Sequence, residues 1–177
     1  MWTPADFTRG AQLARLGEQL GALHALRDPA VAPFDPLGLA DAYLEPARRR
    51  RAGLAPADAA RAGRRARASR GGSPARRRRR PARSLVHGDL PCIHTNLLQG
   101  ERLWLLDFEY AQRADPLYDA GCVLAYYPAA RPAIGELLAA ACPGGRVAPE
   151  ELEAATAVHR ALAGLWHLAR GEPGEAP

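Results

Sequence analysis

Residues 85–121 read LVHGDLPCIHTNLLQGERLWLLDFEYAQRADPLYDAG, and this stretch decides the expected fold. It opens with a short apolar run that breaks at Gly88, which predicts a strand followed by a tight loop. Two further apolar runs flank residues 99–101, which predicts a β-hairpin. Asp115 and Pro116 then offer a cap and a first-turn proline for a helix. The polar side chains of this stretch are therefore expected at strand ends and in tight loops.

Helical patterns lie on both sides of this β unit. Leucines recur at three- and four-residue spacing from Leu13 to Leu23, which is typical of a helix with one buried face. His24 shares that face and is expected to be a hydrogen-bonded core histidine. The expected helices cover about residues 3–26, 35–44, 116–126, 132–141 and 149–170. The predicted fold class is therefore α+β, mostly α, with one small β unit.

The composition narrows the class of protein. The chain has 177 residues, enough for one domain, and its 47% of apolar and 24% of charged residues exclude a wholly disordered chain. No apolar run is long enough to cross a bilayer, and the first residues lack the pattern of a secretory signal, so we expect a cytoplasmic protein with no membrane partner. Three widely spaced cysteines argue against a disulfide framework or a zinc site.

An arginine-rich segment interrupts this globular composition. Residues 48–83 hold 15 of the 24 arginines and a single acid, so the rest of the chain is acidic. The segment has one large aliphatic residue and no aromatic residue, so it cannot contribute much to a core. Its composition fits a solvated linker, an out-of-frame reading of a GC-rich gene, or an electrostatic tail for nucleic acid. We do not expect nucleic acid as a partner, because no aromatic residues are interleaved with the arginines.

The chemistry-bearing residues are Asp89, Asn96 and Asp107, which follow the predicted strands. Phosphoryl transfer needs a carboxylate to receive the proton of the acceptor hydroxyl and oxygen ligands for Mg²⁺. Asp89 suits the first role, and Asn96 with Asp107 suits the second. With His87, their order matches the catalytic loop of kinases, followed by the Asp-Phe-Gly position with Glu109 in place of glycine.

The stretch LVHGDL…HTNLL…LWLLDFEYAQRADPLYDAG resembles the aminoglycoside phosphotransferase and choline/thiamine kinase-like family, and LARLGEQLGALHAL and FDPLGLADAYLE resemble that family's upstream helices. The resemblance implies a protein-kinase-like fold and an ATP- and Mg²⁺-dependent transfer of phosphate to a small-molecule alcohol. It also implies Asp89 as catalytic base, Asn96 and Asp107 as ligands of the metal and nucleotide, His87 as a support of the loop, and Asp119 as a buried anchor of its backbone.

Two features depart from the family pattern. Asn96 follows Asp89 by seven positions rather than five, which a two-residue insertion of Pro91 and Cys92 explains. Family members also have an N-terminal β-rich lobe that covers the ATP phosphates and carries a lysine, and this sequence contains no lysine. We therefore expect the C-terminal lobe alone, weak or inactive by itself, with an N-terminal lobe that is absent or separately encoded.

The expected organisation has four parts: helices of the lobe at 1–47, the arginine-rich linker or insert at 48–83, the catalytic loop, metal-binding hairpin and C-terminal helices at 84–171, and a tail at 172–177. Acidic and aromatic residues predict a pocket for a cationic alcohol. The resemblance implies the same class, with choline, thiamine, an aminoglycoside or a related amino alcohol as the substrate. The candidates to line its pocket are Glu109, Tyr110, Trp104, Tyr126, Tyr127 and Trp166, although aromatic residues at helical spacing also suit a core.

Other readings of the same residues remain open. His87, Asp89, His94, Asp107 and Glu109 could form the metal centre of a hydrolase. Aspartates at turns and helix caps could equally belong to an inert domain. The arginine-rich segment could belong to a non-catalytic interaction protein.

Overall fold

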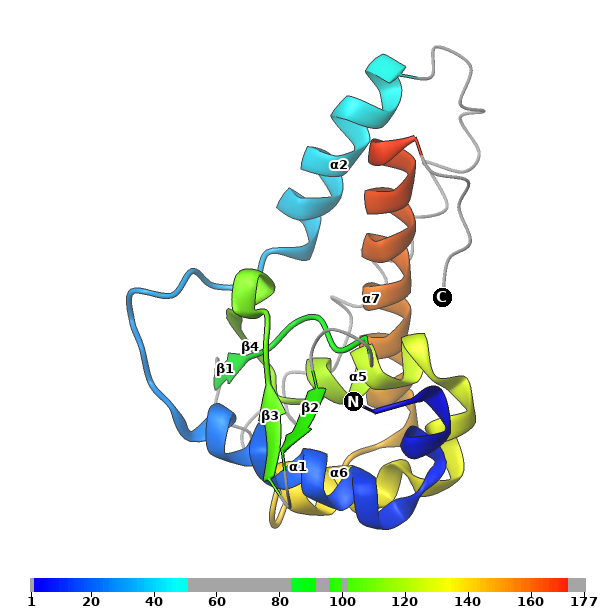
Figure 1. Cartoon of the computed structure of the whole chain (residues 1–177). Helices are drawn as coiled ribbons and strands as arrows, with labels where there is room; N and C mark the ends of the chain where they lie inside the picture. The colour runs from blue at the N-terminus through cyan, green and yellow to red at the C-terminus, as the bar shows by residue number, and fades with distance from the viewer. Residues whose placement is uncertain (1, 51–83, 92–95, 100–101, 172–177) are drawn as a thin grey trace.

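The computed structural model describes residues 2–50, 84–91, 96–99 and 102–171, without the side chains of 46–50, 96–99 and 102. These residues form a mostly helical fold with two small antiparallel sheets (Figure 1), which confirms the predicted class. The elements are the 3₁₀ helix η1 (Pro4–Thr8), α1 (Gly10–Ala25), α2 (Pro36–Arg50), β1 (Ser84–Val86), β2 (Asn96–Gln99), β3 (Arg102–Leu105), the 3₁₀ helix η4 (Phe108–Tyr110), β4 (Gln112–Ala114), α5 (Leu117–Tyr126), the 3₁₀ helix η5 (Pro128–Ala133), α6 (Ile134–Ala141) and α7 (Pro149–Arg170).

The predicted first helix is two elements, because the chain bends at Arg9 between η1 and α1. Phe7 and Leu13 are both fully buried. On one continuous helix, residues six apart point about 120° away from each other, so both could not face the same core. The bend lets the Phe7 ring stack on Tyr127, with ring centroids 4.0 Å apart. A contact that is distant in sequence therefore overrides the local helical pattern.

Helix α2 is longer than the predicted 35–44 and continues through Arg50. Alanine and arginine are both good helix formers, so the start of the arginine-rich segment does not stop it. The remainder of that segment, 51–83, lies outside the described residues, and so do the tail 172–177 and Cys92. The division of the chain into four parts stays a prediction.

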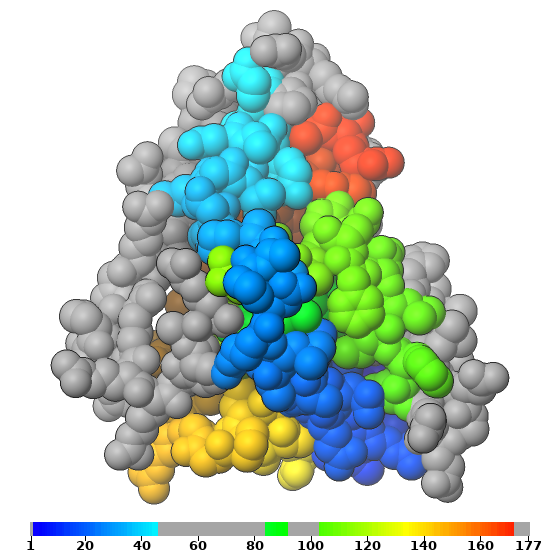
Figure 2. Space-filling view, turned by 90° about the vertical axis from the view of Figure 1, so that its left-hand side faces the viewer, coloured from blue at the N-terminus to red at the C-terminus, as the bar shows by residue number. Residues whose placement is uncertain are grey.

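Three helix pairs build the core. Helix α1 packs on α6, α5 packs on α7, and α2 runs along α7 at one end of the molecule (Figure 1). In Figure 2 the end of α7 is visible beside α2. The predicted leucine face of α1 is buried as expected. Helices α5 and α7 approach closely at Gly121, where a Cβ would lie 2.7 Å from the Ala155 backbone, so only glycine fits.

The two sheets determine where the loops that carry the polar residues lie. Strands β2 and β3 pair antiparallel on either side of residues 100–101, which confirms the predicted hairpin. Strand β1 pairs with β4, with Val86 opposite Gln112. Strand β4 was not predicted, because QRA has no large apolar or β-branched residue to mark it. This pairing brings the end of β1 next to the segment that follows β3.

The last helices match their sequence signals with one difference. Asp115 caps α5 by accepting a hydrogen bond from the Leu117 backbone N–H at 2.9 Å, and Gly171 ends α7 in the left-handed conformation. The predicted helix from residue 132 is instead a 3₁₀ helix followed by α6 from Ile134. In the part of the chain that the structure describes, no helix is long and apolar enough to span a membrane.

Candidate active site

Asp89 lies in the loop directly after β1 and is half-buried. Its Oδ1 accepts a hydrogen bond of 2.7 Å from the hydroxyl of Tyr126, at the end of α5. Burial raises the pKa of Asp89, and the nearby carboxylates of Asp107 and Glu109 add to this rise, while the Tyr126 hydrogen bond opposes it. Asp89 is therefore a carboxylate with one oxygen fixed and with an increased affinity for a proton.

Asp119, on α5, holds the backbone of this loop. It is fully buried, and its carboxylate accepts hydrogen bonds from the backbone N–H groups of His87 at 3.0 Å and Gly88 at 2.9 Å. Its Oδ2 also lies 2.9 Å from Nε2 of His24, on α1. Gly88 has φ of +83°, and a Cβ there would lie 2.5 Å from the carbonyl oxygen of Tyr110. The loop is thus fixed from α5 and packed closely against η4.

His87 joins this loop to the end of β3. Its ring is fully buried, and Nε2–H donates a hydrogen bond of 2.8 Å to the carbonyl oxygen of Leu106. The ring also lies 4.7 Å from the Phe108 ring, measured between centroids. These contacts bracket Asp107, so His87 keeps the segment that carries Asp107 beside the loop that carries Asp89.

Asp107 has φ of 64° and is the one non-glycine residue with positive φ in the described part of the chain. Such a conformation costs about 1–3 kcal/mol and is concentrated at functional sites. Its carboxylate is exposed, with no hydrogen bond or ion pair to the other described residues. Asn96 is the first residue of β2, opposite Leu105 in the register, so its backbone lies at the hairpin end from which Asp107 follows.

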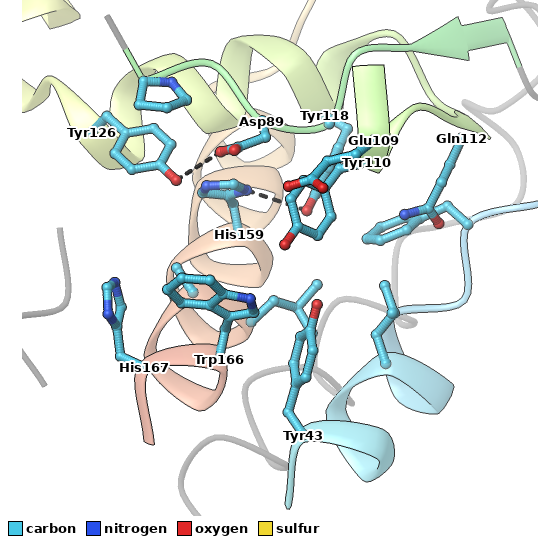
Figure 3. A pocket seen from close by; sticks show the side chains of 16 residues that line it. Tyr43, Asp89, Glu109, Tyr110, Gln112, Tyr118, Tyr126, His159, Trp166 and His167 are labelled. Carbon is cyan, nitrogen blue, oxygen red and sulfur yellow. Dashed lines mark hydrogen bonds between the residues drawn. The ribbon is translucent and has the colours of Figure 1, made fainter. Parts of the chain in front are cut away.

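A cavity of about 350 Å³ opens beside Asp89. Figure 3 shows side chains from α2, α5, α7 and η4 converging on it. Its lining residues are Phe34, Leu39, Tyr43, Gly88, Asp89, Pro91, Glu109, Tyr110, Gln112, Tyr118, Tyr126, His159, Leu162, Ala163, Trp166 and His167. The cavity therefore combines two carboxylates with a largely aromatic and aliphatic wall.

The carboxylates make this cavity electrically negative. Burial raises the pKa of Tyr43, and the interaction with Tyr110 and then the charges of Asp89 and Glu109 raise it further. Burial and the Glu109 charge likewise raise the pKa of Tyr110. Next to the cavity, the Arg170 guanidinium lies over the Trp166 ring, 4.5 Å from its centroid. Arg170 thus places one positive charge near Tyr110, where it opposes the effect of the carboxylates.

Four of the six predicted pocket residues line the cavity: Glu109, Tyr110, Tyr126 and Trp166. The other two do not line this cavity: Trp104 is 47% exposed on β3, and Tyr127 stacks on Phe7. The lining residues on α2, and all of those on α7 except Trp166, were not predicted from the sequence. Tyr126 stands seven residues after Asp119, and this helical spacing could have indicated a shared face.

Two buried histidines predict how stability depends on pH. Burial alone would lower the pKa of His24, but the hydrogen bond and charge of Asp119, with a smaller effect of Cys142, raise it to about 9. Its contribution to stability is fully present below the unfolded pKa of about 6.5 and is lost as pH rises through 9. Burial lowers the pKa of His159 to about 4, so its contribution is lost as pH falls from about 6.5 towards 4.

We therefore expect the thermal midpoint of unfolding to decrease by several degrees on both sides of about pH 6.5. Calorimetry from pH 4.5 to 9.5 measures this profile. His24→Gln is expected to flatten the alkaline decrease and leave the acid one. An unchanged alkaline decrease in His24→Gln would show that this ion pair does not cause it.

Comparisons with known proteins agree with the resemblance. Among solved structures, a choline/ethanolamine kinase family protein from Mesorhizobium loti has a TM-score of 0.70 and 28% identity, covering 98% of this chain and 60% of its own. The choline kinase LicA from Streptococcus pneumoniae shares the fold, with a TM-score of 0.70 and 17% identity over 94% of this chain and 57% of its own. A macrolide 2′-phosphotransferase from Brachybacterium faecium has a TM-score of 0.54 and 26% identity, and the match covers 97% of this chain and 60% of its own.

The chain thus spans about 60% of the length of such structures. No curated protein sequence matches it. Its residues 2–155 match the phosphotransferase enzyme family, a range that includes the catalytic loop, the hairpin and α5. The chain therefore belongs to the phosphotransferase enzyme family.

Proposed function

We propose that this chain moves the γ-phosphate of ATP to a hydroxyl of a small cationic molecule, such as choline, thiamine, an aminoglycoside or a related amino alcohol. The family assignment supports the phosphotransferase class. The observation that carries the proposal is Asp89, a half-buried carboxylate with one oxygen fixed by Tyr126 at the edge of an acidic and aromatic cavity.

In this mechanism Asp89 is the base. Its free oxygen accepts the proton of the substrate hydroxyl while that hydroxyl oxygen forms a bond to the γ-phosphorus. The bond from the γ-phosphorus to the oxygen that bridges the β- and γ-phosphates breaks, and ADP leaves. The raised pKa of Asp89 improves its strength as a base. His87 and Asp119 act by holding the loop, and neither needs to touch the substrate.

We propose Asp107 and Asn96 as the residues that would hold Mg²⁺ at the end of the hairpin. The exposed Asp107 carboxylate offers the oxygen donor that this cation prefers, and no described cation neutralises it. Asn96 starts the paired strand at the same end of the hairpin. When bound, Mg²⁺ supplies neutralisation of the charge on the β- and γ-phosphates. Asp107 and Asn96 would hold this ion next to the loop that carries Asp89.

The cavity wall supports a cationic substrate. Glu109 and Asp89 supply negative charge, and Tyr43, Tyr110 and Trp166 supply aromatic rings. A cation over an aromatic face is stabilised by about 0.5–2 kcal/mol, more when water is excluded. The solved relative at 28% identity is described as a choline/ethanolamine kinase family protein, which fits the same class of amino alcohol.

We also propose that the described fold is the C-terminal lobe of a larger kinase-like enzyme. Two solved structures match 97–98% of this chain. The match covers only 60% of the length of each of those two structures. The sequence has no lysine to contact the nucleotide phosphates, so we expect that contact from an N-terminal lobe, in the same longer protein or separately encoded.

The metallohydrolase alternative has less support. Among the described residues, no three His, Cys, Asp or Glu side chains gather closely enough to hold a metal ion, and His94 lies outside them. Nε2 of His87 is used by the Leu106 carbonyl. No described observation favours the non-catalytic alternatives, the inert domain or the arginine-rich interaction protein.

The test is a phosphorylation assay with [γ-³²P]ATP and Mg²⁺ on choline, ethanolamine, thiamine and an aminoglycoside. It uses the chain alone and the chain joined to the N-terminal lobe of the Mesorhizobium loti relative. The matched control is 3,3-dimethyl-1-butanol, which has the shape of choline without its charge. We expect phosphorylation of a cation at least about tenfold faster than of this analogue, because each 1.4 kcal/mol gives a factor of ten. EDTA should abolish the activity. No transfer in either form would overturn the proposed function, and equal rates for choline and its analogue would overturn the cationic class.

A further inference from the structure

Three residues on one face of α5 contact the catalytic loop after β1. Asp119, Cys122 and Tyr126 are spaced by three and four positions, which places them within about 60° of one another around the helix. Asp119 accepts hydrogen bonds from the backbone N–H groups of His87 and Gly88. The Cys122 thiol donates to the carbonyl oxygen of Gly88 at 3.5 Å.

Tyr126 extends this row of contacts from the backbone to the reacting side chain. Its hydroxyl donates to Oδ1 of Asp89 at 2.7 Å, a short distance typical of a hydrogen bond to a carboxylate. A carboxylate can rotate about its χ2 angle, and a hydrogen bond to one of its oxygens limits this rotation. Asp119 and Cys122 fix the loop, so the orientation of the Asp89 carboxylate depends on Tyr126.

We propose that Tyr126 is a positioning residue, which holds Oδ1 of Asp89 so that Oδ2 is presented to the hydroxyl of the substrate. This inference rests on the proposed function, in which Asp89 is the base. Tyr126 does not itself exchange a proton in the reaction. It restricts the base to one orientation and keeps one oxygen free to receive the proton.

The surroundings of Tyr126 suit this task. Its ring lies 5.1 Å from the His159 ring at an interplanar angle of 64°, so its position is set by packing. Nδ1 of His159 lies 3.2 Å from the Tyr118 hydroxyl and 3.1 Å from the Cys122 sulfur, which fixes the imidazole in turn. Burial and the adjacent Asp89 charge raise the pKa of Tyr126, so it stays protonated and remains a donor.

Other groups near Asp89 do not replace this hydrogen bond. Asp107 and Glu109 are acidic and repel its charge. His159, on α7, is neutral at pH 7 because burial lowers its pKa to about 4. His87 donates from Nε2 to the Leu106 carbonyl. Tyr126 is thus the one side-chain donor to Asp89 within the described residues.

The direct test measures the pKa of Asp89 by ¹³C NMR of its carboxyl carbon, assigned by comparison with Asp89→Asn. Tyr126→Phe keeps the ring and removes the donor, so we expect the pKa of Asp89 to rise by about one unit. Tyr43→Phe is the matched control, since Tyr43 lines the same cavity from α2 without a hydrogen bond to Asp89. It should change this pKa by less than about 0.3 units, a small fraction of that hydrogen-bond effect. An unchanged pKa in Tyr126→Phe would overturn the inference.

This measurement needs no catalytic activity, so its failure is distinguishable from failure of the proposed function. In the phosphorylation assay, Tyr126→Phe is expected to lower kcat about tenfold, and the acid limb of the pH profile should move up with the pKa of Asp89. A role in stability alone would move neither the pKa nor this limb. If Tyr126→Phe lowers the thermal midpoint substantially, Tyr126→Leu gives a second test, because leucine is smaller than tyrosine, stays apolar and has no hydrogen-bond donor. An acid limb that stays in place in both variants would overturn the inference.

Discussion

Asp89→Asn is expected to lower kcat for phosphorylation of a cationic alcohol by about 100-fold to 10,000-fold, the usual contribution of a general base. Asparagine has nearly the same shape, and its Oδ1 can still accept the hydrogen bond from Tyr126. What it loses is the ability to take up a proton from the substrate hydroxyl. The effect should therefore fall on kcat, with the fold and the thermal midpoint little changed.

The matched control is Glu109→Gln, which neutralises the other carboxylate of the same cavity. Glu109 is proposed to attract the cation rather than to take a proton, so we expect a higher KM for the cationic substrate and a smaller effect on kcat. Steady-state assays of both variants in the form that is active separate the two roles. If Asp89→Asn retained more than about a tenth of the wild-type kcat, the carboxylate would not act as the base.

The features that the sequence predicted are those with local signals. Gly88 marks the end of β1 because its backbone takes a positive φ, which few other residues adopt. The Asp115-Pro116 pair marks the start of α5, and the structure shows the capping hydrogen bond. The hairpin follows from two apolar runs around a turn. Each of these signals acts over a few residues, so tertiary contacts are not needed to recognise it.

The features that were missed depend on contacts between distant residues. The bend before α1 follows from the stacking of Phe7 on Tyr127, and neither residue indicates the other in sequence. Strand β4 forms because Gln112 pairs with Val86, not because its own residues favour a strand. The pocket wall needs α2 and α7 side by side, which hydrophobic periodicity alone cannot place. Periodicity does show which face of a helix is buried.

Asp119→Asn is expected to destabilise the protein by about 3–5 kcal/mol, because removing one partner of a buried ion pair leaves the other charge uncompensated. His24 is protonated at pH 7, with a pKa of about 9, and both side chains are buried. Asparagine would also place an N–H₂ donor opposite donors of the loop or of His24. Urea unfolding followed by circular dichroism measures the change. Asp41→Asn, at an exposed position of α2, is the control and should stay within about 0.5 kcal/mol.

The double variant Asp119→Asn/His24→Leu separates the two functions of Asp119. Removing His24 as well removes the unpaired buried charge, so the double variant should be more stable than the sum of the single effects predicts. The loss that remains belongs to the hydrogen bonds with the backbone of His87 and Gly88. Because those bonds hold the loop that carries Asp89, the double variant should still have a reduced kcat even where it is folded. An Asp119→Asn protein that is as stable and as active as the wild type would show that the loop is held by other contacts, and that α5 does not anchor the site.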